Sequence, residues 1–481
     1  MAEQKSKVVT TNLLWRFAER CGAQGVTFIV SIVLARLLDP KVYGTIALVT
    51  VFTTILQVFI DSGLGNALIQ KKNADNIDFS TVFIFNITVC SVLYLSMFFA
   101  APLIAKFYGR PELVPVVRVL SITLLISGVK NIQQAYVSRH MLFKRFFFAT
   151  LGGTLGAAAI GIFMAYKGLG VWALVAQNLF NQTVDTIILW VTVKWRPQLA
   201  FSFKRLKELF TYGWKLLLSS LIDTVYNDLR QLIIGKLYTE SDLSFYNKGK
   251  QFPNLIVTNI NASIDSVLLP TMSSEQDDRE RVKAMTRRAI KTSTYIMMPL
   301  MVGLEVCGEP IIDLLLTSKW LPCVPYLRIF CFSFAFYPIH TANLNAIKAM
   351  GRSDLFLKLE IIKKAIGLIM LISTMRFGVI WMAYSLLFTT ITNSIINSFP
   401  NSKLLGYSYL QQIKDMLPQI LLSAVTGVAV YAVQFLRLSD IPTLFIQVIL
   451  GVTIYVSGSV LFKFESFYYL LTIIKNFKKK K

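Results

Sequence analysis

Long apolar runs, separated by short segments rich in charge, proline or glycine, recur along the whole chain. A membrane-spanning helix needs about 20 consecutive, mostly apolar residues. About fourteen runs reach that length, and each predicts one such helix. They cover residues 13–38, 42–69, 79–105, 114–137, 146–166, 169–193, 206–238, 243–270, 289–317, 322–347, 355–376, 377–400, 413–436 and 441–470. The pattern predicts an all-α polytopic membrane protein with about 14 transmembrane helices.

Composition supports this class. Of the 481 residues 54% are hydrophobic and only 16% are charged, and the mean hydropathy is +0.57. The first apolar run contains Arg16, Glu19 and Arg20 and has no small-residue cleavage site after it. We therefore expect it to remain as the first transmembrane helix rather than to be removed as a signal peptide.

The formal net charge of +23 is concentrated in alternate loops. If the N-terminus lies inside, the inside segments hold more than three Lys or Arg for each one outside. This asymmetry predicts that both termini are cytoplasmic. The terminal run Lys478–Lys481 predicts an electrostatic contact with anionic membrane lipids.

Nothing in the sequence predicts an enzyme. The longest loop, Thr271 to Arg288, is too short for a folded soluble domain, and its SSEQDDRERVK stretch is interpreted as a solvated cytoplasmic connector. Two histidines and five cysteines form no metal-binding or catalytic motif, and no phosphate-binding loop of the Walker A type is present. We expect no catalytic residues, no metal, no cofactor and five reduced cysteines.

Weak internal similarity indicates a duplication. Trp15-Arg16 aligns with Trp214-Lys215 at an offset of 199, Asp61 aligns with Asp265 at 204, and Trp172 aligns with Trp381 at 209. Six predicted helices lie between the first pair, so both halves enter the membrane from the same side. The sequence therefore predicts two parallel six-helix repeats, residues 1–200 and 201–400. Two extra transmembrane helices and a basic cytoplasmic tail follow in residues 401–481.

Polar residues inside apolar helices are expensive and indicate a cavity or a partner. In the first run Arg16, Glu19 and Arg20 share one face, although an interfacial helix start would also explain them. In the seventh run a polar stripe covers about 120° of a helix. It comprises Lys215, Ser219, Asp223, Tyr226, Asn227 and Arg230. These two faces predict a lined central cavity between the halves.

Two acidic repeat mates, Asp61 and Asp265, suggest either helix caps or carboxylates that take up a proton or a sodium ion during transport. Arg118, Lys130 and Asn131 in the fourth run, and Asp185 in the sixth, add polarity to the first half.

Several segments resemble the polysaccharide repeat-unit flippases of bacteria. LARLLDPKVYGTIAL (Leu34 to Leu48) and DSGLGNALIQKKN (Asp61 to Asn73) are similar to their N-terminal signature. In the second half, YGWKLLLSSLIDTVYNDLRQLIIGKLY, SFYNKGKQFPNLIV, IDSVLLPTMS and KWLPCVPYLRIFCFS are similar to corresponding segments. These exporters, called Wzx-type, belong to the multidrug/oligosaccharidyl-lipid/polysaccharide (MOP) superfamily.

The resemblance implies a flippase of the bacterial inner membrane. Such a protein moves an undecaprenyl-pyrophosphate-linked oligosaccharide to the periplasmic leaflet by alternating access, for O-antigen, capsule or exopolysaccharide assembly. It implies a cationic cavity, with Arg16 and Arg20 at positions where related flippases of a peptidoglycan precursor keep arginines. A polysaccharide polymerase would be a possible partner.

An anionic pyrophosphate needs Arg or Lys donors, and sugars need hydroxyl or amide partners. The expected pyrophosphate-binding residues are Arg16, Arg20, Lys215, Arg230, Arg118 and Lys130. The expected sugar-binding residues are Gln24, Gln57, Asn131 and Asn227. Ion coupling or charge balance is assigned to Glu19, Asp61, Asp223 and Asp265. The polyprenyl tail is expected to remain in lipid, with the last two helices as a wall for it.

Two alternatives stay open. A multidrug exporter of the same superfamily would favour an acidic, aromatic cavity, which the basic residues of the first, fourth and seventh helices oppose. A membrane glycan polymerase or ligase would need a sizeable periplasmic loop, and no predicted loop is long enough.

Overall fold

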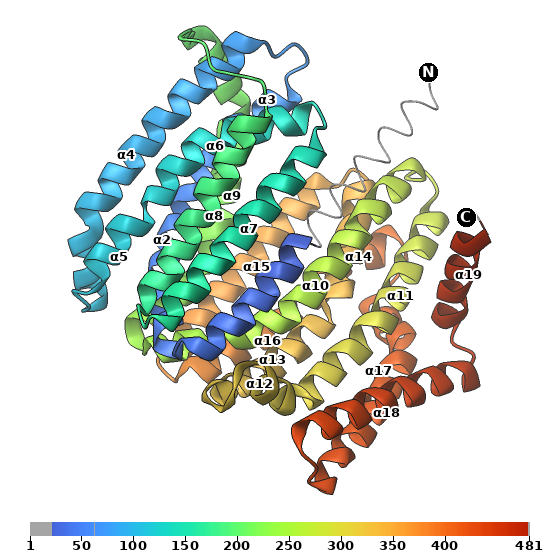
Figure 1. Ribbon diagram of the computed structural model, residues 1–481. Helices are drawn as coiled ribbons and strands as arrows, with labels where there is room; N and C mark the ends of the chain where they lie inside the picture. The colour runs from blue at the N-terminus through green and yellow to red at the C-terminus, as the bar shows by residue number, and fades with distance from the viewer. Residues whose placement is uncertain (1–21, 62, 480–481) are drawn as a thin grey trace. The chain divides into compact units, whose positions relative to one another are not determined.

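The computed structural model describes residues 22–61 and 63–479, and every regular element in those ranges is a helix (Figure 1). This agrees with the predicted all-α class. A helix Gly22–Leu37 comes first. The others are α2 Pro40–Asp61, α3 Leu64–Gln70, α4 Asn76–Tyr108, α5 Leu113–Leu120, α6 Ile122–Arg139, α7 Phe143–Tyr166, α8 Val171–Thr192, α9 Phe203–Leu237, α10 Glu240–Ser274, α11 Arg279–Val306, α12 Gly308–Leu316, η1 Ser318–Cys323, α13 Val324–Ala335, α14 Tyr337–Ala349, α15 Ser353–Thr374, α16 Val379–Leu404, α17 Tyr409–Ala432, η2 Val433–Leu436, α18 Asp440–Leu461 and α19 Glu465–Lys479.

Over its described residues, each predicted apolar run coincides with one helix or with consecutive helices. Among the described residues, nine segments are long and apolar enough to cross a membrane. The chain is therefore a multi-pass membrane protein, and the count of fourteen spans stays a prediction. The fourth run is divided between α5 and α6, and the ninth between α11 and α12.

Two boundaries differ from the sequence prediction. The long loop expected at 271–288 is mostly helix, because α10 continues to Ser274 and α11 begins at Arg279. The Asp278 carboxylate accepts a hydrogen bond from the backbone N–H of Arg281 at 3.0 Å and so caps α11 early. The expected last helix at 441–470 ends at Leu461, and α19 follows as a separate helix of 15 residues.

The chain forms two compact units, Met1–Ser244 and Phe245–Lys481. The first contains α9, which the repeat prediction places with the second half. The repeat boundary at residue 200 stays a prediction, whereas the packing boundary follows α9 because this helix contacts α2, α3 and α4.

Ion pairs tie α9 to the rest of the first unit. The fully buried carboxylate of Asp78, in the first turn of α4, lies 2.9 Å from the Lys71 ammonium and 3.3 Å from the Arg205 guanidinium. Arg205 also donates to Asp75, the N-cap residue of α4. That hydrogen bond is the main reason why the pKa of the Asp75 carboxyl is lowered to about 2.

Helices α7 and α8 make the most extensive pairing in the first unit because α7 presents glycines to α8. A Cβ at Gly156 would lie 2.5 Å from the ring of Phe180, and one at Gly153 would lie 2.9 Å from the backbone oxygen of Asn181. Only glycine permits this separation of the two helices.

In the second unit α17 packs on α11, and α18 packs on α17 and α12. The Tyr295 hydroxyl of α11 donates to Ser459 of α18 at 2.9 Å, and the Tyr455 hydroxyl donates to the Tyr295 carbonyl at 2.8 Å. The two extra helices of the sequence prediction are thus integral parts of the second unit.

Candidate functional site

A stripe of polar side chains runs along α2. Thr50, Thr53, Thr54, Gln57 and Asp61 recur at the spacing that puts residues on one helical face. All five line a pocket of about 300 Å³ in the first unit. Because the walls are mostly hydroxyl and amide groups, the pocket is polar inside an otherwise apolar bundle.

Helices α5, α6 and α8 complete the pocket. Thr123 of α6 and the amides Asn178 and Gln182 of α8 line it together with Leu120 of α5. Gln182 is held in place by Ser127, whose hydroxyl donates to it at 3.0 Å. Hydroxyl and amide groups can both donate and accept, which matches the requirements of sugar hydroxyls.

Asp61 carries the formal charge of the pocket and is held by two amides. Gln57 donates to its Oδ1 at 3.2 Å, and Asn131 of α6 donates to the same oxygen at 3.2 Å. Asn131 in turn accepts from Asn86 of α4 at 3.4 Å. Three predicted site residues, Gln57, Asp61 and Asn131, are therefore brought together in one chain of hydrogen bonds.

Lys130 belongs to a separate ion pair. Its ammonium lies 3.2 Å from Oδ2 of Asp185 on α8, and the two side chains are 16% and 13% exposed. The charge expected to bind pyrophosphate is thus balanced by an acid beside it. Arg118 is also engaged, because its guanidinium lies 4.2 Å above the ring of Phe98 and its Nε donates to the Phe98 carbonyl at 3.3 Å.

The second unit repeats the central contact of the pocket. Asn345 of α14 donates to Oδ1 of Asp265 on α10 at 2.6 Å. The aspartates are 204 residues apart, which is an offset of the predicted repeat, whereas the asparagines are 214 apart, outside the range of 199 to 209. The repeat mates Asp61 and Asp265 therefore share a structural role as acceptors from an asparagine.

The remaining predicted residues that the structure describes do not line this pocket. The stripe from Lys215 to Arg230 lies on one unbroken helix, α9, as the periodicity required. Lys215, Asp223 and Asn227 are exposed on it and Arg230 is partly buried. Gln24 is exposed near the start of the first described helix. Arg16, Glu19 and Arg20 lie outside the described residues, and the roles predicted for all of these residues stay predictions.

Sequence reasoning missed the threonines of α2, Asn86, Ser127, Asn178 and Gln182. The α2 residues were predictable from the sequence. The helical period that puts Lys215 to Arg230 on one face also puts Thr50, Thr53, Thr54, Gln57 and Asp61 on one face of α2. Asn178 and Gln182 stand one turn apart on α8 and gave a weaker signal of the same kind. Among the described residues no cluster of His, Cys, Asp and Glu could hold a metal ion.

Comparison with known proteins agrees with this architecture. The model of the family described as "Polysaccharide biosynthesis protein" matches residues 33–325, more than half of the chain. The succinoglycan biosynthesis transport protein ExoT of Rhizobium meliloti is 24% identical over 72% of this chain and 70% of its own length. The teichuronic acid biosynthesis protein TuaB of Bacillus subtilis is 28% identical over 63% of each chain. The lipopolysaccharide biosynthesis protein WzxC of Escherichia coli is 22% identical over 85% of this chain and 84% of its own.

Solved structures show the same fold. The lipid II flippase MurJ in an inward closed conformation superposes with a TM-score of 0.76 at 16% identity, covering 94% of this chain and 98% of its own. An inward-facing multidrug transporter of the MATE family superposes with a TM-score of 0.62 at 15% identity, covering 79% and 95%. The chain therefore belongs to the polysaccharide biosynthesis protein family and has the fold of the MOP superfamily transporters.

Proposed function

We propose that this protein is a flippase that moves undecaprenyl-pyrophosphate-linked oligosaccharide units across the bacterial cytoplasmic membrane by alternating access. The observation that carries the proposal is the family match over residues 33–325, together with relatives named as polysaccharide transport proteins. The same membrane fold serves lipid flippases and drug transporters, so the fold alone does not choose the substrate.

The polar pocket of the first unit supports a glycan substrate. Its lining offers hydroxyl and amide groups and a single formal charge, that of Asp61. Sugars are bound by such neutral hydrogen-bonding groups, whereas a lipophilic cation would require several acids or aromatic rings. Among the described residues, no aromatic side chain lines the pocket.

The cationic residues of the first and seventh helices are proposed to bind the pyrophosphate. Arg16, Arg20, Lys215 and Arg230 would replace the water around the anion during passage. Asp223 and Glu19 would balance these charges when no substrate is bound. The protein performs no covalent chemistry in this mechanism, and both termini are proposed to be cytoplasmic.

Asp61 is proposed to couple transport to a proton or a sodium ion. Its Oδ1 accepts from Gln57 and Asn131 at the pocket wall, so neutralising the carboxylate would change both hydrogen bonds. Gln57 and Asn131 lie on α2 and α6, and a change in their bonds would alter how these helices pack. Asp265 would respond in the same way through Asn345 in the second unit.

The test is translocation in proteoliposomes. A fluorescent polyprenyl-pyrophosphate oligosaccharide is placed in the outer leaflet, and the fraction protected from an impermeant quencher is followed with and without an ion gradient. We expect the wild-type protein to move this lipid and not a lipophilic cation. The double variant Arg16→Ala/Arg20→Ala should remain folded and lose movement.

Asp61→Asn should move the lipid without responding to the gradient, whereas Asp354→Asn, at an exposed carboxylate paired with Arg352, should respond normally. Movement of the cation alone would replace the flippase proposal by drug export. An Asp61→Asn variant with full gradient dependence would remove Asp61 from the coupling mechanism.

A further inference from the structure

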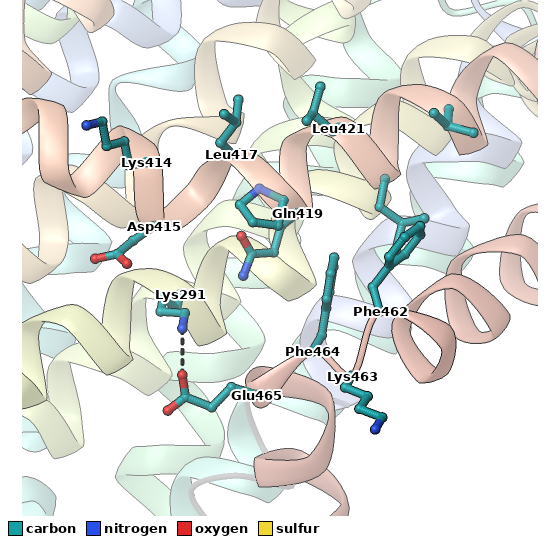
Figure 2. A pocket seen from close by; sticks show the side chains of 13 residues that line it. Lys291, Lys414, Asp415, Leu417, Gln419, Leu421, Phe462, Lys463, Phe464 and Glu465 are labelled. Carbon is teal, nitrogen blue, oxygen red and sulfur yellow. Dashed lines mark hydrogen bonds and ion pairs between the residues drawn. The ribbon is translucent and has the colours of Figure 1, made fainter.

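The second unit contains a groove bounded by α11, α17 and the turn between α18 and α19 (Figure 2). Its volume is about 780 Å³. One wall is the outer face of α17, formed by Leu417, Leu421 and Val425. The turn contributes Phe462 and Phe464, whose rings lie side by side with centroids 6.4 Å apart. Leu421 and Val425 are more than half exposed, so no side chain in the described ranges covers this wall of the groove.

Lysines from three different segments line the groove: Lys291 of α11, Lys414 of α17 and Lys463 of the turn. The Glu465 carboxylate is paired with Lys291 at 2.5 Å (Figure 2). This ion pair is the main reason why the pKa of Glu465 lies below its ordinary value. The Glu465 charge is therefore already neutralised within the protein.

The other acid, Asp415, is neutralised as well. Arg287 approaches its Oδ1 at 2.6 Å, and the Tyr407 hydroxyl donates to its Oδ2 at 2.8 Å. Within residues 22–61 and 63–479, Lys414 and Lys463 form no ion pair. Both ammonium groups are exposed, and the groove therefore carries two positive charges that the described part of the chain does not balance.

The backbone at Lys463 is held in an unusual conformation. Phe464 N–H bonds to the Ser459 carbonyl and Lys463 N–H to the Val460 carbonyl, at 3.0 and 3.2 Å, which is the Schellman pattern of a helix end. Lys463 occupies the left-handed position of this motif, with φ of 49°. Glycine is favoured there because other residues are strained by their Cβ. The same pattern elsewhere in the described part of the chain uses Gly109, Gly168 and Gly351, and once Met141.

Lys414 is close to the start of α17, on the side that the loop charges predict to be cytoplasmic. Lys463 falls inside the predicted span 441–470, but in the structure it follows the end of α18. Because α17 and α18 lie between the two lysines along the chain, two crossings return Lys463 to the same predicted surface as Lys414. That leaflet is rich in anionic lipids, which attract lysines near the membrane surface. The apolar walls of the groove match the acyl chains of a phospholipid, and the two unbalanced ammonium groups match its anionic headgroup.

We propose that this groove is a binding site for an anionic phospholipid of the cytoplasmic leaflet. Lys414 on one side of the groove and Lys463 on the other attract the anionic headgroup, and the acyl chains lie against Leu417, Leu421 and Phe462. The bound lipid joins the α18–α19 turn to α17 and so fixes the position of the C-terminal helix. The strained left-handed position carries a lysine instead of glycine, and in this proposal its ammonium attracts the anionic headgroup. The groove lies on the helices that are also expected to form a wall for the polyprenyl tail, so the experiment compares the two lipids directly.

The experiment measures the thermal unfolding midpoint of the purified full chain in detergent while phosphatidylglycerol or phosphatidylcholine is added. Phosphatidylglycerol should raise the midpoint of the wild-type protein and phosphatidylcholine should not. The double variant Lys414→Gln/Lys463→Gln should need a roughly 30-fold higher concentration of phosphatidylglycerol for the same shift. Lys72→Gln, at an exposed lysine of the first unit, is the matched control and should behave as wild type.

Lys463→Gly separates a binding role from a structural one. Glycine relieves the strain of the turn, so the lipid-free midpoint should be unchanged or higher, while the response to phosphatidylglycerol should weaken. A full response in this variant, or in the double variant, would overturn the proposal. If the variants lose the response to a polyprenyl pyrophosphate and keep that to phosphatidylglycerol, the groove belongs to the substrate lipid and the proposal is likewise wrong. None of these outcomes depends on flippase activity.

Discussion

Asn131 joins three helices of the first unit through one amide, since it donates to Asp61 on α2 and accepts from Asn86 on α4. Polar contacts of this kind inside a membrane are worth about 0.6 kcal/mol on average, so they hold helices in register more than they stabilise the fold. The sequence identified Asn131 and Asp61 as polar residues in apolar helices. It did not identify the bond between them, because 70 residues separate them and the packing of α2 on α6 decides the contact.

Lys130 and Asp185 provide the sharpest test at this scale. Lys130→Met should lower the free energy of unfolding by about 3 kcal/mol, because it leaves a nearly buried carboxylate without its cation. Asp185 Oδ1 already has no hydrogen-bond partner among the described residues, and Oδ2 would lose its partner Lys130, so neither carboxylate oxygen would be paired. Thermal unfolding in detergent measures the change.

The double variant Lys130→Met/Asp185→Leu should recover most of that stability, because neither charge remains. If the double variant is less stable than Lys130→Met, the pair is not the unit of stabilisation. A loss of glycan movement in a stable double variant would show that Lys130 also contacts the substrate.

At the scale of elements, the polar stripe of α2 and the glycine face of α7 arise from the same helical period. On α2 the stripe faces the pocket, and on α7 the small residues face α8. Both patterns can be found in the sequence. The helices themselves were predicted from the apolar runs alone. The end points of α10, α11 and α18 were predicted less well, because caps and turns rather than hydropathy decide where a helix begins and ends.

Gly156→Leu should prevent the close approach of α7 to α8 and reduce the yield of folded protein. Its Cβ would lie 2.5 Å from the ring of Phe180, and overpacking of this kind costs about 1–3 kcal/mol. Gly303→Ala in α11 is the matched control, since no atom lies within 4 Å of a Cβ built there. That variant should be neutral or slightly more stable because alanine favours the helix. Equal behaviour of the two variants, measured by unfolding midpoint and yield, would contradict the packing account.

At the scale of the whole molecule, the two units use equivalent contacts with exchanged charges. Asp78 of α4 pairs with Arg205 near the start of α9, and Arg287 of α11 pairs with Asp415 near the start of α17. The members of the two pairs are 209 and 210 residues apart. Helix α17 therefore has the same relation to the second unit as α9 has to the first. The predicted duplication would account for this equivalence, with acid and base on opposite helices in the two copies.

Exchanging the charges of the second pair tests this relation. Asp415→Arg alone should destabilise the protein by about 2 kcal/mol, because it replaces a bidentate pair by two facing cations. Arg287→Asp/Asp415→Arg should restore part of the loss by reproducing the arrangement of the first unit. Unfolding midpoints of the single and double variants measure the coupling. If the double variant loses as much stability as the two single variants together, the two charge arrangements are not interchangeable.

The sequence by itself determined the class of the protein, the positions of its helices and the family resemblance. These follow from hydropathy, helical period and loop charge, which act over a few turns of one segment. Only the tertiary structure decided which polar residues meet. In the folded protein Gln57 and Asn131 bind Asp61, and Lys130 pairs with Asp185. The groove of α17 is formed by three separate segments. These contacts depend on how helices far apart in the chain pack, and a small residue such as Gly156 determines that packing without a signal in the hydropathy.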